Sequence, residues 1–383
     1  MWGIEKEMKR RTVAISIALI VILVSVLTAS QLLTSPPKAE ELYVGVEIAY
    51  KNATASDVKV MVDRVKDYTN LIVIGAPEIS INQTALNETC DYIYDAGMHF
   101  IVLFTKRENY TTYDSFNWMT EAQQKYGKKF LGVYRYDEPG GNQLDRGREI
   151  LVTNATSFAD AAAQYTGSLG FIINYYQTFA GQVFTSDYSL HWFDYQSSYS
   201  AVFAEFASNN TREIAVAQCR GAARSFNRDW GAMIAWKYDV RPFIESGEAL
   251  FNDMVLAYTN GAKYLVVFDY PKLDTYGILT EAHFEALKKF WNYYNSNPQD
   301  FNSRKANVAY MLPQDYGFGL RRADDKIWGL FEPDALSGKV WTDVKKLVDL
   351  YGFSWDLVYE EPGVVNAARN RYERLFFWNE TIP

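Results

Sequence analysis

The chain has 383 residues, of which 48% are hydrophobic and 22% are charged, so it can bury a large core and is not dominated by disorder. Its formal net charge is -8, and it has no long basic run, which argues against a nucleic-acid partner because phosphates require clustered Lys and Arg. Aromatic residues make up 16% of the chain. Their Tyr and Trp members need polar partners, so we expect some of them at the rim of a wet cleft.

Residues 1–40 have the features of a membrane-targeting segment. Four basic residues between Lys6 and Arg11 precede an uncharged run from Thr12 to about Leu33, close to the roughly 20 residues that span a bilayer as a helix. The basic flank predicts that the N-terminus stays in the cytoplasm and that the main body is extracellular. We therefore expect a single-pass anchor in the cell membrane. The alternative is a signal peptide cleaved near Ala29, which would leave the body secreted.

Glycosylation sequons also favour export, because composition alone would give roughly two or three of them. The chain has Asn-x-Ser/Thr at Asn52, Asn82, Asn87, Asn109, Asn154, Asn209 and Asn379. Polar loops that generate sequons by chance are the competing explanation. Cys90 and Cys219 are the only cysteines, which excludes a disulfide-stapled scaffold, and we expect them in helices too far apart to pair.

From residue 42 onward, short apolar segments alternate with amphipathic helical ones, which indicates a parallel sheet. The segment 56–68 is typical of the helices, with apolar residues at i, i+3, i+4 and i+7 and with Ser56 or Asp57 placed as a cap. The predicted strands are Leu42–Ile48, Leu71–Ile74, Phe100–Phe104, Phe130–Tyr134, Val183–Thr185, Ala201–Phe206, Ala232–Trp236 and Tyr264–Phe268. Eight such units in 41–298 predict an α/β fold of the (β/α)8 TIM barrel type. A doubly wound open sheet is the alternative, and Ile214–Cys219 competes as a strand.

A second unit is predicted in residues 299–383, after a polar linker. Its elements alternate as strand, helix, strand, helix and strand: Asn307–Leu312, Lys339–Tyr351, Trp355–Tyr359, Val364–Arg371 and Leu375–Trp378. We expect a small three-stranded α/β domain of Rossmann-like character.

Acidic residues stand at the predicted carboxyl ends of the barrel strands, where the working residues of this fold gather. They are Glu47, Asp137, Glu138, Asp187, Glu205, Asp239 and Asp269, accompanied by Tyr134, Tyr136, Tyr188, Trp192, Tyr195, Trp236, Tyr238 and Tyr270 and by the cations Arg135 and Lys237. Sugar rings stack on aromatics, and glycosidic cleavage uses two carboxyl groups, so this set predicts a carbohydrate site. The competing interpretation is that the acids only cap the following helices.

Other chemistries lack the residues that they require. The histidines are widely separated, no Cys/His spacing suggests zinc, and neither a phosphate-binding loop nor a Gly-x-Ser-x-Gly elbow occurs. Asp187, Asp239 and Asp269 lack the spacing of a calcium loop. We therefore expect no metal and no cofactor.

Several short motifs carry a family resemblance: Tyr136–Pro139 after the fourth strand, Trp230–Gly231 and Trp236–Tyr238 around the seventh, and Ser186–Tyr195, Arg220–Ala223 and Leu312–Gly317 elsewhere. The first three resemble the (β/α)8 glycoside hydrolase superfamily. The last three resemble archaeal membrane-anchored surface proteins of that superfamily. The C-terminal unit is similar to the amidotransferase-like domain that follows the barrel in some β-galactosidases.

The resemblance implies an acid/base carboxyl group after the fourth strand, which falls on Glu138. It also implies a nucleophile after the seventh strand, where this chain departs from the pattern with Lys237, Tyr238 and Asp239. The candidates for the second catalytic carboxylate are Glu205, Asp187 and Asp239, in that order. The remaining candidates are assigned to substrate binding: Asp137, Tyr136, Tyr188, Trp192, Trp236, Lys237, Tyr238, Asp239 and Asp269.

We expect an apolar environment from Tyr134, Tyr136 and Trp236 to keep Glu138 protonated, and Arg135 or Lys237 to keep its partner ionised. The predicted function is an extracytoplasmic glycoside hydrolase that acts on a glycan. The alternative is a cell-surface carbohydrate-binding protein built on a degenerate glycosidase barrel. The sequence does not specify an oligomeric state.

Overall fold

The computed structural model describes residues 41–105, 112–147, 149–301 and 306–383. Residues 41–383 form one compact unit. The predicted membrane anchor and the Asn109 sequon lie outside the described residues. Within the described ranges, no helix combines the length and the apolar character needed to cross a bilayer.

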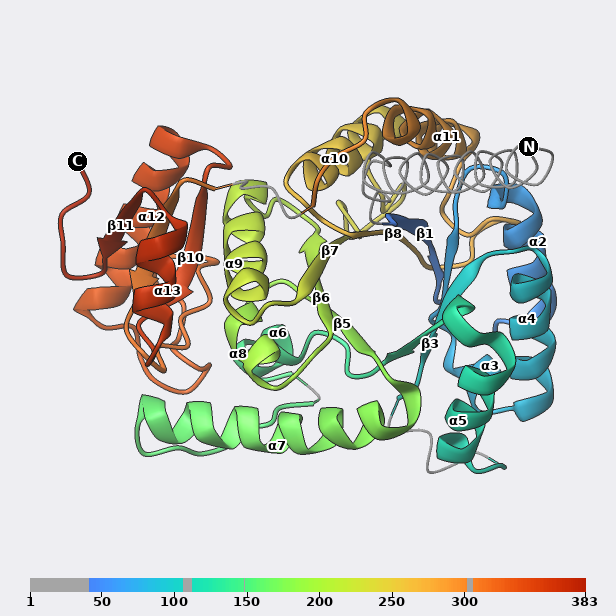
Figure 1. The fold of residues 1–383 in the computed structure, drawn as a ribbon, viewed down its shortest axis with the longest axis horizontal. Coiled ribbons are helices and arrows are strands. Elements are labelled where there is room, and N and C mark those ends of the chain that lie inside the picture. Colours follow the sequence, from blue (N-terminus) through green and yellow to red (C-terminus); the bar gives the residue numbers. More distant parts are fainter. Residues whose placement is uncertain (1–40, 106–111, 148, 302–305) are drawn as a thin grey trace, which may run out of the picture. The chain divides into compact units, whose positions relative to one another are not determined.

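Eight parallel strands close into a barrel in chain order, with helices around it (Figure 1). They are β1 (Tyr43–Ile48), β2 (Leu71–Ile74), β3 (His99–Leu103), β4 (Phe130–Tyr134), β5 (Val183–Asp187), β6 (Ala201–Phe206), β7 (Asp229–Ile234) and β8 (Tyr264–Asp269). Because β1 pairs with both β2 and β8, the sheet has no open edge. This confirms the predicted (β/α)8 barrel and rules out the doubly wound alternative.

The helices around the barrel are α2 (Ala55–Val65), α3 (Pro77–Ser80), α4 (Gln83–Asp95), α5 (Ser115–Tyr126), α6 (Pro139–Leu144), α7 (Phe158–Ala180), α8 (His191–Gln196), α9 (Arg212–Ser225), α10 (Gly247–Thr259) and α11 (Glu281–Ser296). Thr54, and not Ser56 or Asp57, precedes α2 as its cap, and the Asp57 carboxylate accepts from the Thr54 backbone N–H at 2.9 Å. The alternative strand Ile214–Cys219 lies inside α9.

Alternation along the strands decides which side chains fill the barrel. Ala201 and Phe203 of β6 belong to the inner cluster, and Tyr43 of β1 packs against it. The same period of two brings Glu205, two residues after Phe203, and Glu47, four residues after Tyr43, to the inward face near the carboxyl ends of their strands. The carboxyl groups of Glu47 and Glu205 therefore lie inside the barrel, at the carboxyl ends of the strands and next to an otherwise apolar core.

The C-terminal unit is a parallel sheet in the order β10-β9-β11, which confirms the predicted three strands. It consists of β9 (Val308–Leu312), α12 (Ala335–Tyr351), β10 (Trp355–Tyr359), α13 (Val364–Arg371) and β11 (Arg374–Phe377). Arg220 of α9 is fully buried and donates to Asp356 of β10 at 2.7 Å. A Cβ on Gly221 would stand 2.2 Å from the carbonyl oxygen of Leu357, so glycine allows α9 to approach β10. Because α9 is buried between the barrel and the C-terminal sheet, it is apolar on more than one face. This is why the segment Ile214–Cys219 resembles a strand in the sequence.

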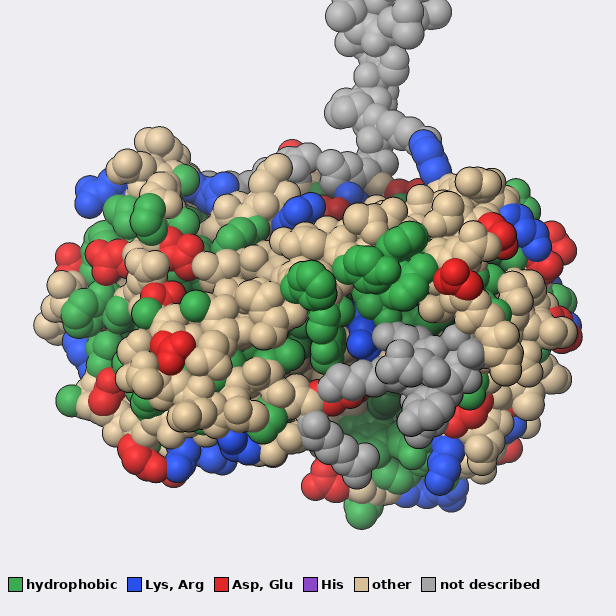
Figure 2. Space-filling view, turned by 90° about the horizontal axis from the view of Figure 1, so that it is seen from below, with side chains coloured by type: hydrophobic (Ala, Val, Ile, Leu, Met, Phe, Trp, Pro, Cys, Tyr) green, Lys and Arg blue, Asp and Glu red, His purple; other side chains and the backbone are tan. Residues whose placement is uncertain are grey.

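The side of the barrel formed by α5 and α7 faces the viewer in Figure 2, where hydrophobic side chains gather near the middle. Phe171 and Tyr175 of α7 are exposed. Tyr175 meets Phe116 of α5 edge-on, with ring centroids 4.9 Å apart. Some of the hydrophobic side chains on this side therefore belong to the packing of α5 on α7.

Cys90 and Cys219 are both buried and free, which confirms that they do not pair. Among the described sequons, five asparagines are exposed: Asn52, Asn82, Asn154, Asn209 and Asn379. Asn87 differs, because it is half-buried and its side-chain oxygen accepts from the Trp118 indole N–H at 2.8 Å.

Candidate active site

Two carboxyl groups meet at the mouth of the barrel, above its inner core. Glu138 lies between β4 and α6 with a φ of +50°, a left-handed conformation that is rare for a residue other than glycine. Glu205 lies in β6, and its carboxyl group is within hydrogen-bonding reach of that of Glu138. Two carboxylates at such a range do not both ionise readily, so the pair holds one proton between them.

Burial sets the acidity of this pair. It raises the pKa of Glu138 to about 7, and repulsion from Asp137 acts in the same direction. Glu205 is 6% exposed, and burial raises its pKa well above the ordinary value, with the charge of Glu138 adding to the effect. The hydroxyl of Ser186 donates to Glu205 Oε1 at 2.5 Å and favours the ionised form. One carboxyl group of the pair therefore remains protonated near neutral pH.

Hydroxyl groups, rather than cations, surround the pair. The Tyr134 hydroxyl lies 2.9 Å from Asp137 Oδ1 and 2.8 Å from Ser186 Oγ. Asp137 is exposed at its surface, and desolvation by the surrounding protein raises the pKa of its carboxyl group. Tyr134 and Ser186 thus connect Asp137 to Glu205.

Glu47 is a third inward carboxyl group. It is buried, its Oε2 has no hydrogen-bond partner among the described residues, and burial raises its pKa to about 8. A Cβ on Gly75 of the neighbouring strand end would stand 2.3 Å from Glu47 Oε1, so glycine makes room for this side chain. Glu47 belongs to the predicted set of acids but was given no catalytic or binding role, and Ser186 was given none either. Strand alternation is the signal that could have identified them.

Asp187 does not face the open mouth. It has no exposed surface, and its carboxylate accepts from four backbone N–H groups: Gly140 at 2.5 Å, Gly141 at 2.9 Å, Tyr188 at 2.8 Å and Ser189 at 3.1 Å. Because Gly140 and Gly141 begin the helix that follows Glu138, Asp187 fixes that turn. The geometry leaves Glu205, and not Asp187, in contact with Glu138.

Two predicted substrate-binding residues are engaged inside the protein. Asp269 has no exposed surface, and it accepts from the hydroxyl of Tyr50 and from the backbone N–H of Ile278. Trp192 is buried against the C-terminal unit, where its indole N–H donates to Glu361 at 2.6 Å. In this structure neither side chain is available to a ligand at the barrel mouth. Both side chains are held by partners that are distant in sequence, Tyr50 for Asp269 and Glu361 for Trp192.

The residues after β7 form a loop rather than the end of a strand, because β7 ends at Ile234. Trp236 stacks on Tyr270 with ring centroids 5.8 Å apart and an interplanar angle of 15°. Both rings are half-buried, whereas Tyr238 and Asp239 are exposed. This loop places aromatic rings at the mouth of the barrel, whereas its carboxylate, Asp239, lies five residues after the end of β7.

The two expected cations are not placed beside the carboxyl pair. Arg135 follows the inward Tyr134, so alternation turns it outward, where it lies over the rings of Tyr136 and Tyr176 at 4.5 and 5.3 Å. Tyr136 is accordingly buried outside the barrel lumen. Lys237 is half-buried, and its charge acts on Glu245. The expectation that these cations keep the second carboxylate ionised is wrong.

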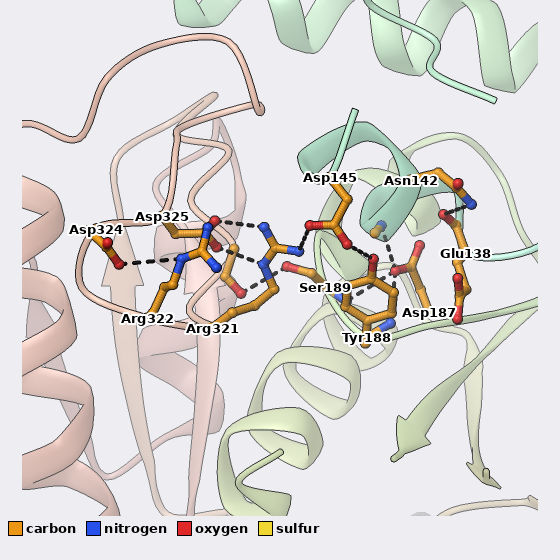
Figure 3. A network of polar contacts seen from close by, with 12 residues as sticks. Glu138, Asn142, Asp145, Asp187, Tyr188, Ser189, Arg321, Arg322, Asp324 and Asp325 are labelled. Carbon is orange, nitrogen blue, oxygen red and sulfur yellow. Dashed lines mark hydrogen bonds and ion pairs between the residues drawn. The ribbon is translucent and has the colours of Figure 1, made fainter. Parts of the chain in front are cut away.

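A chain of polar contacts joins the turn that carries Glu138 to the C-terminal unit (Figure 3). The side chain of Asn142 donates to the carbonyl oxygen of Glu138 at 3.0 Å. Further along the chain, Asp145 accepts from the Tyr188 hydroxyl at 2.6 Å and from Arg321 at 2.6 Å. Arg321 belongs to the loop after β9, so the C-terminal unit supports the active-site turn.

Among the described residues, no group of three or more His, Cys, Asp or Glu side chains is arranged to hold a metal ion. The arrangement therefore consists of carboxyl groups, hydroxyl groups and aromatic rings.

Solved structures that share this fold include two glycoside hydrolases. α-L-Fucosidase isoenzyme 2 from Paenibacillus thiaminolyticus aligns with a TM-score of 0.53 and 12% identity over 87% of this chain, which spans 59% of the fucosidase. A GH5_18 from Bifidobacterium longum subsp. infantis aligns with a TM-score of 0.51 and 11% identity, over 88% of this chain and 97% of the other. No protein-family model matches the chain, and no curated protein matches its sequence. These two likenesses show that the chain shares the (β/α)8 barrel fold.

Proposed function

We propose that this protein is a glycoside hydrolase whose reaction takes place between Glu138 and Glu205. The proposal rests on one observation: two carboxyl groups at the mouth of a closed (β/α)8 barrel lie within hydrogen-bonding reach and hold one proton between them. A protonated and an ionised carboxyl group are the two components that glycosidic cleavage requires.

Glu138 is the proton donor, because its half-buried side chain on a loop can exchange protons with solvent in each cycle. It protonates the glycosidic oxygen while the Glu205 carboxylate attacks the anomeric carbon, which forms a glycosyl ester and releases the leaving alcohol. Water, deprotonated by Glu138, then cleaves the ester and restores both groups. Glu205 suits the role of nucleophile because it belongs to a strand and is held by Ser186.

The short separation favours retention of configuration. Inverting enzymes keep their carboxyl groups about 6.5–9.5 Å apart to admit a water molecule, whereas retaining enzymes place them about 5–5.5 Å apart. A pair of carboxyl groups within hydrogen-bonding reach is closer to the second arrangement. Substrate entry separates the two groups and leaves the proton on the one nearer to the glycosidic oxygen.

A glycan-binding protein without catalysis is the second candidate. It is favoured by the Trp236 and Tyr270 stack and by the exposed Tyr238, which offer sugar-stacking rings independently of the carboxyl pair. In that case glycan binding survives the loss of both Glu138 and Glu205.

We also propose that the body is extracytoplasmic and attached to the cell membrane through residues 12–33. The basic flank, the apolar run and the exposed sequons support this location. Protease treatment of intact cells should digest the region after residue 38 and spare residues 1–11, and the reverse pattern would contradict the proposal.

The function is tested by screening the purified chain against a panel of aryl glycosides. Wild type should hydrolyse at least one of them, and Glu138→Gln and Glu205→Gln should each lower kcat/KM by about 10²–10⁴ while thermal stability is kept. Glu285→Gln, an exposed change on α11, is the matched control. Hydrolysis that both site variants retain would remove the proposal.

A further inference from the structure

A recess lies between the barrel and the C-terminal unit, beside the candidate active site. Tyr188, which directly follows β5, and Asn210, in the loop after β6, line it on the barrel side. Arg321 and Trp341 line it from the C-terminal unit. Its volume is about 80 Å³. The backbone N–H of Tyr188 donates to Asp187, which also accepts from Gly140 in the turn after Glu138, so Tyr188 and Asp187 connect the recess to that turn.

The polar groups in this recess have unused hydrogen-bonding capacity. Gln218 of α9 is only 7% exposed, yet no described residue makes a hydrogen bond to its carboxamide. Arg321 uses three of its five N–H donors on Asp145 and Asp325, which leaves two. The indole N–H of Trp341 donates to no described residue either. A buried amide without a partner is costly unless a ligand or water satisfies it.

The charge balance of the recess favours a neutral ligand. The guanidinium of Arg321 lies between the carboxylates of Asp145 and Asp325, as Figure 3 shows, so its charge is already compensated. A phosphate or a carboxylate would have to approach these two acids. Neutral hydroxyl groups can accept from the remaining N–H donors and donate to the Gln218 carbonyl, while the ring of Trp341, which lines the recess, suits a sugar ring.

We propose that this recess is a second sugar subsite, which holds a neutral residue of a glycan chain away from the bond that is cleaved. This subsite deepens the proposed function and rests on it, because the bound glycan must run from the recess to the carboxyl pair. It makes the protein selective for oligosaccharides and polysaccharides over single glycosides. It also gives the C-terminal unit a role in substrate selection.

The test uses the full-length chain carrying Glu138→Gln, so that the probe survives, and titrates it with cellohexaose, mannohexaose, xylohexaose and chitohexaose. Gln218→Met keeps the side-chain volume and removes the amide, and Trp341→Leu removes the ring. Each should raise the Kd of the bound hexasaccharide about 3- to 10-fold, the size expected from one neutral hydrogen bond or stacking contact. Trp291→Leu, a half-buried tryptophan of α11, is the matched control and should leave the Kd unchanged.

A parallel assay of the same changes in the active chain separates this proposal from the proposed function. The KM for an aryl monoglycoside should move less than twofold in Gln218→Met and Trp341→Leu. An unchanged hexasaccharide Kd in both variants, an equal loss on the aryl glycoside, or the absence of binding by any hexasaccharide would overturn the subsite. None of these results would remove hydrolysis at Glu138 and Glu205, which the aryl glycoside reports independently.

Discussion

Asp187 Oδ2 accepts a hydrogen bond from the backbone N–H of Gly140 at 2.5 Å, and this contact holds the first turn after Glu138 in place. Together with the other three N–H groups that donate to Asp187, it replaces water around a fully buried carboxylate. The position of Glu138, the proposed proton donor, thus depends on a residue that does not contact solvent.

Asp187→Asn should therefore destabilise the protein and impair its activity. The amide nitrogen would face backbone N–H groups and leave them unsatisfied, at a cost of about 2–3 kcal/mol in the free energy of unfolding. Urea unfolding measures this cost, and Asp349→Asn, an exposed change on α12, is the control. Wild-type stability in Asp187→Asn would contradict the bracing role.

The two carboxylates that flank Arg321 should differ in how much they contribute to the free energy of unfolding. The Asp325 side chain is 1% exposed, whereas that of Asp145 is 55% exposed, although both contacts measure 2.6 Å. Solvent screens the exposed pair, so Asp145→Asn should cost less than about 1 kcal/mol, and Asp325→Asn about 3 kcal/mol. Equal losses in chemical denaturation would show that burial does not set the strength of these pairs.

Glu47 should make stability depend on pH in a defined direction. Burial raises its pKa from the ordinary 4.5 to about 8, so the folded state binds the proton more tightly than the unfolded chain does. Its stabilising contribution is complete below about pH 4.5 and is lost as the pH rises through 8. Glu47→Gln removes this loss and should raise the relative stability at pH 8.5 by on the order of a few kcal/mol. Parallel stability curves for the two proteins between pH 5 and 8.5 would refute this.

The sequons should differ in whether their asparagine is glycosylated. The side chain of Asn87 is held by Trp118 and is half-buried, whereas Asn52, Asn82 and Asn154 are exposed. Expression in a host with N-glycosylation, followed by glycopeptide mass spectrometry, should find sugar on exposed asparagines and none on Asn87. A modified Asn87 in folded protein would show that this contact is not maintained.

The sequence predicted the barrel because β-branched apolar runs recur with amphipathic helices between them. At the fifth strand the prediction ended too early, because β5 continues through Ser186 and Asp187. Both are polar but fully buried, and their partners come from distant residues such as Tyr134 and Gly140. Hydrophobicity alone cannot show such a strand end.

The candidate site was predictable only in part. Tyr136–Pro139 marked the position of Glu138, but the approach of Glu138 to Glu205 depends on the pairing of β4 and β6 with β5, between residues that are far apart in sequence. Alternation could have shown that Arg135 points away once Tyr134 points inward. The burial of Trp192 could not be predicted locally, because the C-terminal unit provides its partner Glu361.

The central claim is that Glu205 is the nucleophile and Glu138 the proton donor, and the most direct test is to trap the glycosyl ester. The active chain is incubated with the 2-deoxy-2-fluoro fluoride of the sugar that it hydrolyses, digested, and examined by mass spectrometry. We predict one added glycosyl group on the peptide that contains Glu205, and no labelling of Glu205→Gln. A label on Glu138, on Asp137 or on the loop after β7 would contradict this assignment.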